Sequence, residues 1–422
     1  MPAMKNLDAN IVWDVAVIGG GPAGMMAAGR AAELGAKVVL IEKNAGLGKK
    51  LLITGGGRCN VTNNEPDNRK LLAKFKDGGK FLASPFAQWN VENTLEFFHS
   101  RAMLTKEEAE KRVFPASNTA QSVWDVLVEY LKAGSVTILS NSPVVDVVAN
   151  GNVIEKVILK NKKEIRAKSF IFATGGISRP ETGSTGDGFA FLKKLGHTVS
   201  DTEGALVPVA VKDSWVKRAA GVSMQNVKIT LYQNGAKQDS RIGKILFTHV
   251  GLSGPGILNA SRDIGELLKY GEVVIELDLL STEGPEKVNA RLQEIFKAND
   301  KKMIRNSLTG LVPPALVPIL LELADIKPET SCNSIKREER IRLAKLLKAL
   351  KLEVKGLLGL DKAIITSGGV SLEEIDFKTM RSLKYSNLYI VGDLLNIDRP
   401  SGGYSLQICW TTGFVAGTAA AA

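Results

Sequence analysis

The sequence predicts an α/β protein whose mostly parallel sheet is interrupted by a β-rich insert, and three observations support this. Residues 14–43 have the pattern of a strand, a glycine-rich turn, a helix and a second strand. Residues 200–280 change to short β-like runs, and residues 386–417 again have an apolar strand pattern followed by glycines, like residues 14–43. Because 422 residues exceed what one compact core normally holds, two or three domains are expected.

The opening segment carries the strongest motif of the chain. The apolar, β-branched run at 15–18 is typical of a buried parallel strand. It leads into glycines with G-x-G-x-x-G spacing and then into an alanine-rich helix that should end near Gly35. The run at 37–42 gives a second strand whose last residue is Glu42. Strand, glycines, helix, strand and acid in this register are typical of a Rossmann-like dinucleotide-binding unit.

Each part of this motif has a physical role in holding a dinucleotide. Gly19 permits the tight turn, Gly21 leaves room for a pyrophosphate, and Gly24 lets the helix pack closely on the strand. The helix N-terminus offers unpaired N–H groups to the phosphates, and Glu42 is placed to accept hydrogen bonds from a ribose diol. We expect the turn and the second strand end to contact the cofactor: Gly19, Gly21, Pro22, Ala23, Gly24, Glu42 and Lys43.

Composition narrows the class of protein. The chain is 44% hydrophobic with a mean hydropathy of +0.02, and no apolar run is long enough to span a bilayer. The N-terminal residues lack the charged-then-apolar pattern of a secretion signal. The cysteines, Cys59, Cys332 and Cys409, are far apart, which favours a reducing compartment without a disulfide framework. We therefore expect a cytoplasmic globular protein without a metal site.

The net charge of +11 leaves an anionic partner open. The basic residues are dispersed, with one concentration at 334–356, where apolar residues recur at helical spacing between Lys and Arg. The favoured interpretation is an amphipathic helix with a solvated basic face, so a nucleic-acid partner is disfavoured without being excluded. No membrane partner is expected.

A loop dense in glycine and basic residues follows the second strand at 46–63. Glycines 55–57 allow backbone N–H groups to approach an anion, while Lys49, Lys50 and Arg58 supply positive charge. We interpret it as a loop that lies along the pyrophosphate and reaches toward the reactive ring. An ordinary basic surface loop is the alternative.

Four short β-like runs come next, at 136–140, 144–149, 153–160 and 164–176. Asn-rich turns separate the last three, which should form antiparallel hairpins. The final run ends in Ala173, Thr174 and Gly175, small residues that would permit close approach to the same cofactor. Neither 181–197 nor any later segment repeats G-x-G-x-x-G, so we expect one tightly bound dinucleotide and no separate nicotinamide-binding domain.

The middle of the chain is typical of an insert. The β-like runs at 200–280 predict a barrel or a sandwich, and 284–358 has a helical pattern. His249, Ser253 and Asn259 invite comparison with a catalytic triad, but G-L-S-G-P is no nucleophile elbow and no acid partner is evident. A turn that caps the next helix at Ser253 is favoured. His249 lining a substrate cleft is a hypothesis, beside a core or surface histidine.

The C-terminal segment returns to cofactor-binding patterns. The run at 387–393 is a buried strand that ends in Gly-Asp, and Gly402, Gly403 and Tyr404 precede a helix rich in small residues. Asp393 would accept hydrogen bonds from the polyol of a flavin's ribityl chain, and the positive helix end would stabilise the reduced ring. These features favour a flavin nucleotide.

The combination resembles a known family. The motifs LLITGGGRCNVTN (51–63), ATGGISRPETGSTGDG (173–188) and LYIVGDLLNIDRPSGGYSLQICWTTG (388–413) are similar to those of bacterial flavoproteins called BaiN-like, YhiN-like or aminoacetone-oxidase-family. These belong to the glutathione-reductase-like FAD superfamily. The resemblance implies a Rossmann-like FAD domain from 1–198 and 366–422, a β-barrel insert of 199–283 and 359–365, and a helical subdomain of 284–358.

Carried over by position, the resemblance also implies which residues contact or border FAD. These are Gly19, Gly21, Gly24, Glu42, Arg58, Cys59, Asn60, Val145, Gly392, Asp393, Gly403 and Tyr404. Neighbouring residues of the same loops complete the expected site: Lys50, Thr54, Gly55, Gly57 and Gly402.

We therefore expect an FAD-dependent oxidoreductase that passes two electrons through the flavin N5. NAD(P)H would dock transiently as the donor, and the substrate would be a small organic molecule such as a conjugated enone. Two alternatives stay open: a flavin-dependent amine oxidase, and a flavin-bearing RNA- or partner-binding protein that uses the basic helix at 334–356. The lack of a C-x-x-C pair argues against disulfide-reductase chemistry. Catalytic candidates are Cys59, His249 and Tyr404, although packing is favoured for Cys59.

Overall fold

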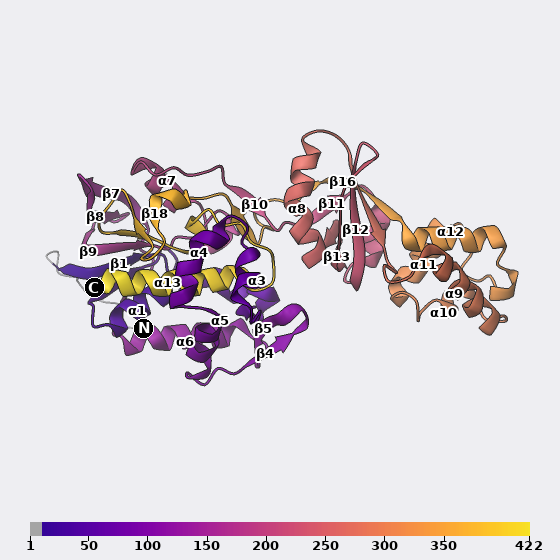
Figure 1. Ribbon diagram of the computed structural model, residues 1–422, viewed down its shortest axis with the longest axis horizontal. Helices are drawn as coiled ribbons and strands as arrows, with labels where there is room; N and C mark the ends of the chain where they lie inside the picture. The colour runs from indigo at the N-terminus through magenta and orange to yellow at the C-terminus, as the bar shows by residue number, and fades with distance from the viewer. Residues whose placement is uncertain (1–10) are drawn as a thin grey trace. The chain divides into compact units, whose positions relative to one another are not determined.

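The computed structural model describes residues 11–422, and the chain divides into two compact units (Figure 1). The first unit runs to Gly204 and resumes at Ile364–Ala422, while the second comprises Ala205–Ala363. Segments from both ends of the sequence therefore share the hydrophobic core of the first unit.

The first unit is organised around a nine-stranded sheet with β1 (Val12–Ile18) at its centre. β1 pairs in parallel with β2 (Val38–Ile41) and β9 (Glu164–Phe172), and β9 pairs in parallel with β20 (Leu388–Ile390). The residues at 15–17 are fully buried, which is why an unbroken apolar run encodes this strand. The predicted Rossmann-like arrangement is confirmed.

The outer strands extend this sheet on both sides. β6 (Thr137–Leu139) adds in parallel to β2, whereas β7 (Val144–Asn150) and β8 (Val153–Leu159) form the predicted antiparallel hairpins with β9. The other edge consists of β18 (Ile375–Asp376) and β19 (Arg381–Ser382). The sheet is thus parallel from β20 to β6, and its antiparallel strands are the β7–β8 hairpin beside β9 and the edge formed by β18 and β19.

Two helices from opposite ends of the described chain pack against each other in this unit. α1 (Pro22–Glu33) and α13 (Tyr404–Ala421) lie side by side in Figure 1. A Cβ atom at Gly413 or Gly417 would come within 2.5 Å of the carbonyl oxygen of Ala23 or Ala27, respectively. The small residues of α13 thus permit a close approach of two helix backbones.

The remaining elements of the first unit form its outer layers. Its other helices are α2 (Lys49–Ile53), α3 (Asn68–Ala73), α4 (Gly78–Gln88), α5 (Val91–His99), α6 (Ala120–Ala133) and α7 (Asp187–Lys194). A three-stranded sheet contains β3 (Thr62–Asn63), β4 (Thr105–Glu108) and β5 (Arg112–Pro115), in the order β3-β5-β4.

The second unit contains a closed antiparallel barrel and not a sandwich, which confirms the β-barrel insert that the family resemblance implied. Its strand order is β11 (Val209–Val211), β14 (Gly251–Ser253), β13 (Ala236–Phe247), β12 (Ser223–Gln233), β15 (Val273–Asp278) and β16 (Leu350–Leu357). α8 (Pro255–Leu268) follows β14, and its N-cap is Gly254. The expected cap at Ser253 is therefore wrong: Ser253 is the last residue of β14, and Pro255 opens the helix.

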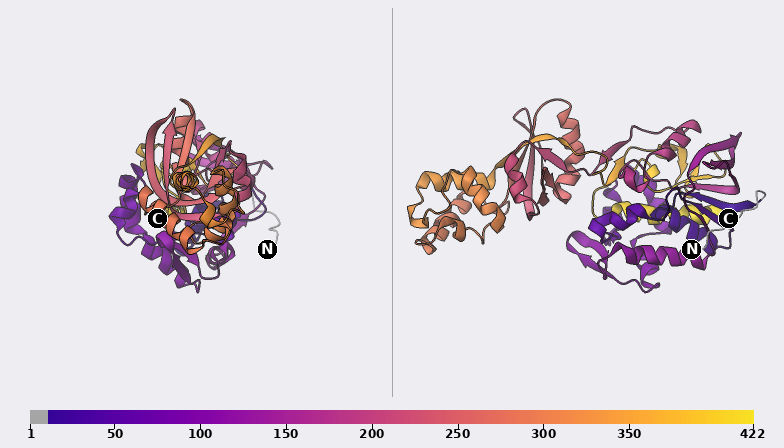
Figure 2. Two further views of the ribbon diagram at one scale, coloured as in Figure 1. Left: turned by 90° about the vertical axis from the view of Figure 1, so that its right-hand side faces the viewer. Right: turned by 180° about the vertical axis from the view of Figure 1, so that it is seen from behind.

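Four helices are inserted between β15 and β16, as Figure 2 shows in orange. They are α9 (Pro285–Ala298), α10 (Ile304–Ser307), α11 (Val317–Leu323) and α12 (Arg337–Lys348). Their buried residues belong to the same hydrophobic cluster as the barrel interior. The nested helical subdomain expected from the sequence is present.

The chain leaves and re-enters the first unit through two paired strands. β10 (Glu203–Ala205) and β17 (Ile365–Ser367) form a two-stranded sheet. Beside it, a Cβ atom at Gly368 would stand 2.1 Å from the carbonyl oxygen of Asp201, so the segments that flank the two strands are also in close contact. The entry and the exit of the insert are therefore adjacent in space.

Candidate cofactor site

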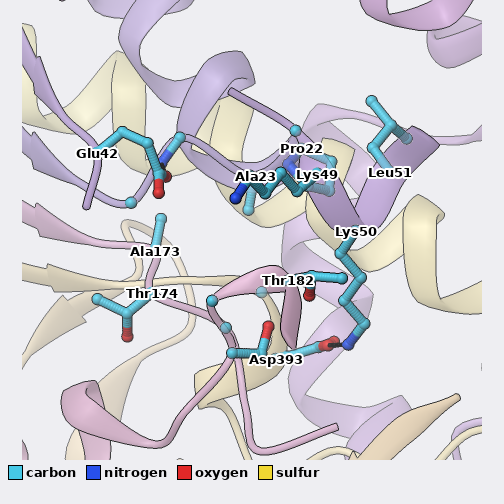
Figure 3. Close-up of a pocket in the computed structure, with 18 of the residues that line it drawn as sticks. Pro22, Ala23, Glu42, Lys49, Lys50, Leu51, Ala173, Thr174, Thr182 and Asp393 are labelled. Carbon is cyan, nitrogen blue, oxygen red and sulfur yellow. Dashed lines mark hydrogen bonds and ion pairs between the residues drawn. The ribbon is translucent and has the colours of Figure 1, made fainter. Parts of the chain in front are cut away.

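The first unit has a cavity at the carboxyl ends of its parallel strands, where α1 begins (Figure 3). In open α/β sheets, ligands bind on this side. The lining comes from the turn after β1, the ends of β2, β9 and β20, helix α2 and the first turns of α13. Of the residues predicted from the sequence, it includes Gly19, Gly21, Pro22, Ala23, Glu42, Lys43, Lys50, Thr54, Ala173, Thr174, Gly175, Gly392 and Asp393.

The glycine turn fits a dinucleotide. Gly19 has φ of +105°, and a Cβ atom there would stand 2.5 Å from the carbonyl oxygen of Ala173. A Cβ atom at Gly24 would stand 1.9 Å from the carbonyl oxygen of Gly19, so this glycine serves close packing. Gly21 faces open space and is the N-cap of α1, with no side chain to cap the helix and Pro22 at its first turn. The first N–H groups of α1 are thus left for an anion such as a pyrophosphate.

Glu42 is held in place by the backbone around the cavity. Its Oε2 atom accepts a hydrogen bond from the N–H of Gly20 at 2.8 Å. Its Oε1 atom accepts from the backbone N–H of Asn44 at 2.7 Å and from the Asn44 side-chain amide at 2.8 Å. An ionised carboxylate offers about four acceptor positions, so Glu42 keeps capacity for a ribose hydroxyl.

Two lysines that line the cavity each form an ion pair with an aspartate. Lys50 Nζ donates to Ser178 Oγ at 2.6 Å and lies 3.3 Å from Asp393 Oδ2, as the dashed line of Figure 3 marks. Lys43 Nζ lies 2.7 Å from Asp187 Oδ2. Burial raises the pKa of Asp187, but hydrogen bonds from Lys43 and Thr185 outweigh it and leave the pKa below its ordinary value.

The glycine-rich loop after α2 lies mostly outside the cavity lining. Thr54 lines the cavity, whereas Gly55, Gly57, Arg58 and Asn60 do not. The Arg58 guanidinium pairs with Glu108 and stacks on a ring of the small sheet, 4.2 Å from the centroid of Phe114. With its side-chain amide oriented so that the oxygen faces Gly403, Asn60 accepts a hydrogen bond from the N–H of Gly403 at 3.0 Å and donates to the carbonyl oxygens of Thr62 and Val113 at 3.0 and 3.1 Å. This loop therefore connects the cavity wall to β3 and β5.

Cys59 is fully buried beneath this loop. Burial raises the pKa of the Cys59 thiol to about 12, against a smaller effect of a hydrogen bond from Thr54. A neutral buried thiol is a poor nucleophile, so its environment supports the packing interpretation.

The C-terminal glycine turn serves packing, and the helix after it reaches the cavity. A Cβ atom at Gly403 would stand 2.4 Å from the carbonyl of Thr62, so this turn lies directly on β3. The Tyr404 ring is buried and packs edge-on against Phe75, with centroids 5.8 Å apart. Gly402, Gly403 and Tyr404 are absent from the lining, which instead includes Ser405, Leu406 and Cys409 of α13.

Two further predicted residues lie away from the lining. Val145 is 51% exposed on β7, while the adjacent Val144 lines the cavity. Because successive side chains of a strand point to opposite faces, the neighbour faces inward. His249 is exposed in the turn between β13 and β14 of the second unit.

Several lining residues escaped the sequence reasoning. Most are distant segments that fold back on the cavity: Asn44, Ser142, Val144, Thr182, Gly183, Ser184, Asp187, Phe191, Ile364, Ile365, Ser405, Leu406 and Cys409. The glycine-rich run at 183–188 was the one sequence signal for these segments. In the structure, Gly183 has φ of +105°, and a Cβ atom there would stand 2.5 Å from the Asn44 side-chain amide.

A parallel sheet, a glycine turn that opens α1, and an acid at the end of β2 define a Rossmann-type dinucleotide-binding fold. Residues 13–419 match the family model described as HI0933-like protein Rossmann domain. The chain belongs to this family, which confirms the resemblance inferred from its motifs.

Two characterised relatives span nearly the whole chain. The chain is 32% identical over 417 residues to a 3-dehydro-bile acid Δ(4,6)-reductase of Clostridium scindens, covering 96% of this chain and 98% of that protein. It is 28% identical over 403 residues to a ribosomal RNA dihydrouridine synthase of Escherichia coli, covering 95% of this chain and 96% of that protein.

Solved structures share the fold at low sequence identity. A flavocytochrome c3 fumarate reductase matches with a TM-score of 0.55 and 16% identity over 98% of this chain and 78% of that one. A 3-ketosteroid-Δ4-(5α)-dehydrogenase of Rhodococcus jostii matches with a TM-score of 0.55 and 17% identity over 98% and 97%, respectively. These neighbours show the fold, while the family and the 32% identical reductase show that the chain is an FAD-dependent oxidoreductase.

No helix among residues 11–422 is both long and apolar enough to cross a membrane. No group of three or more His, Cys, Asp or Glu in the same range is arranged to hold a metal ion.

Proposed function

We propose that this enzyme uses NAD(P)H to reduce a carbon–carbon double bond conjugated with a carbonyl group. The names of both relatives support this chemistry. A bile acid Δ(4,6)-reductase saturates double bonds conjugated with the 3-ketone, and a dihydrouridine synthase saturates the uracil bond conjugated with its carbonyl. One reaction class thus covers two different substrates. The observation that carries the proposal is the cavity lined by this family's glycine turn, Glu42 and Asp393.

We assign the cavity residues to parts of FAD. The N–H groups at the start of α1 would hold the pyrophosphate, Glu42 the adenosine ribose, and Asp393 the ribityl hydroxyls. Bound there, FAD would supply two-electron chemistry, namely hydride transfer from NAD(P)H to the β-carbon of the double bond, and a proton from water would complete the α-carbon. The domain boundaries inferred from the sequence, 1–198 with 366–422 for the FAD domain, belong to the same proposal.

Anaerobic spectroscopy tests the donor and the acceptor separately. The purified holoenzyme is mixed with NADH or NADPH, and the flavin absorbance near 450 nm is followed. We expect bleaching by one of the two, and return of the colour on adding a 4,6-dien-3-one steroid. The matched saturated 3-ketone should leave the flavin reduced. Bleaching by an amine, with reoxidation by oxygen alone, would instead indicate the amine oxidase.

A second candidate substrate of the same chemistry is a uracil base in RNA, and one surface feature favours it. Lys301, Lys302, Lys336 and Arg337 are exposed, and none has an ion-pair partner among the described residues. Backbone hydrogen bonds join their segments, including Cys332 N–H to Lys302 C=O at 3.0 Å. We call these four residues the cationic corner. Unpaired cations of this kind suit a phosphate backbone.

Salt-dependent filter binding of a uridine-containing ribosomal RNA fragment tests this candidate. If RNA is the substrate, Lys301→Gln/Lys302→Gln should lower the slope of log affinity against log salt by about 1 to 2. The matched control is Lys74→Gln/Lys80→Gln, which removes two exposed lysines of the first unit. Equal slopes in the parent and both variants would leave the small-molecule substrate.

A further inference from the structure

Arg399 is a buried arginine, and each of its three side-chain nitrogens donates to a named acceptor. Its side chain is 1% exposed. Nη1 donates to the carbonyl oxygen of Ile397 at 2.7 Å, Nε donates to Ser405 Oγ at 3.0 Å, and Nη2 pairs with Asp393 Oδ1. A buried guanidinium is costly unless it is paired and hydrogen-bonded, and Arg399 has both an ion-pair partner in Asp393 and hydrogen bonds from each of its nitrogens.

The two oxygens of Asp393 are approached from opposite sides. Arg399 contacts Oδ1 from the protein interior and does not line the cavity, whereas Lys50 contacts Oδ2 and does line it. Burial raises the pKa of Asp393, but the charges of Arg399 and Lys50 outweigh this and hold the pKa below its ordinary value. A ligand hydroxyl that reaches Asp393 from the cavity therefore meets Lys50, while Arg399 stays in place behind the carboxylate.

Arg399 also fixes the start of α13. Ser405 accepts its Nε hydrogen bond and itself lines the cavity, and it lies one residue inside the helix that begins at Tyr404. One guanidinium thus joins the strand-end carboxylate to the first turn of the helix, the two C-terminal parts of the cavity wall.

We propose that Arg399 is a positioning residue for FAD, which holds the Asp393 carboxylate and the first turn of α13 in the geometry that binds the cofactor's polyol. Its effect on FAD passes through Asp393. This inference rests on the FAD assignment and not on the substrate, so a wrong substrate leaves it standing.

A double-mutant cycle with the FAD dissociation constant as its readout tests the proposal. Apoprotein is titrated with FAD at low temperature, and circular dichroism confirms that each variant is folded. We expect Arg399→Met to weaken FAD binding about tenfold or more, which corresponds to about 1.4 kcal/mol. Arg69→Met, an exposed arginine of α3, is the matched control and should bind as the parent does.

The second arm of the cycle separates positioning from general support of the fold. In the Asp393→Asn background, Arg399→Met should change the dissociation constant less than threefold, because the partner through which it acts is gone. If Arg399→Met does not fold, Arg399→Lys replaces it, with a roughly threefold to tenfold loss in the parent and none in Asp393→Asn. Parental affinity of the Arg399 variant, or an equal loss in both backgrounds, overturns the proposal.

Discussion

Glu42 shows how one carboxylate can be prepared for a ligand. It is 7% exposed, and its three hydrogen bonds come from Gly20 and Asn44, which both line the cavity. These donors fix its position at the end of β2 before any ribose binds. The sequence could predict the acid from the motif spacing, but not the Asn44 amide that orients it, because that contact depends on the turn after β2.

Replacing Glu42 by arginine should strongly reduce FAD retention. A guanidinium would lose the three hydrogen bonds and place a long cation where the ribose diol binds, so we expect at least tenfold weaker binding. The measurement is the ratio of flavin to protein absorbance after purification, followed by FAD titration. Lys37→Arg, at the start of β2, is a control for added guanidinium size. A Glu42→Arg sample as yellow as the parent would refute the ribose role.

His197 gives a pH-dependent contribution to stability. The ring is 4% exposed, Nε2 lies 2.8 Å from Ser382 Oγ, and Nδ1 is buried with no hydrogen-bond partner among residues 11–422. Burial lowers the pKa of His197 below its ordinary value of 6.5, while the charges of Glu374 and Lys384 act in opposite directions. Below pH 6.5 the unfolded chain binds the proton more readily than the folded one. The stabilisation is complete above pH 6.5 and is lost as the pH falls toward the lowered folded pKa.

We therefore expect the melting temperature to fall between pH 7.5 and pH 5.5, and His197→Gln to show a smaller fall. The matched control is His249→Gln, because His249 is exposed. Melting is followed by circular dichroism at both pH values. An identical pH dependence in the parent and the His197 variant would contradict this account.

At the scale of elements, the close packing of α1 against α13 depends on glycines in α13. α1 and α13 approach so closely that the glycines of α13 face carbonyl oxygens of α1. Sequence patterns could predict that residues 404–421 form a helix rich in small residues, but not its partner, because the two helices are separated by almost the whole chain. Likewise, the sequence predicted a strand at 144–149, but the residue of β7 that lines the cavity is Val144, whereas the predicted Val145 is exposed.

Gly417→Val should destabilise the first unit by about 2 kcal/mol, because the added side chain must move α13 away from Ala27. The shift would also disturb the cavity wall formed by the start of α13, so FAD retention should fall together with the melting temperature. Gly310→Ala is the control, since a Cβ atom there meets nothing within 4 Å. Equal melting temperatures for parent and Gly417→Val would mean that the helices can separate at no cost.

At the scale of the whole molecule, the order of elements along the chain places the cofactor site in one unit. The cavity is lined by residues at 18–191 and 364–409, all of which belong to the first unit. The sequence indicated a domain made from both chain ends because the opening and closing segments share buried strands and glycine turns. The strand pattern alone left a barrel and a sandwich open, because closure depends on the pairing of β11 with both β14 and β16, and the family resemblance pointed correctly to the barrel.

The pairing of β10 with β17 leads to a prediction for the complete chain. Because the entry and exit of the second unit are adjacent, replacing residues 207–362 by a short Gly-Ser linker should leave the first unit able to fold and to bind FAD. We expect a yellow protein whose FAD affinity is within about tenfold of the parent. That result would show that the second unit is not needed to bind the cofactor. A deletion variant that is folded by circular dichroism but cannot be loaded with FAD would show that the second unit contributes to the cofactor site.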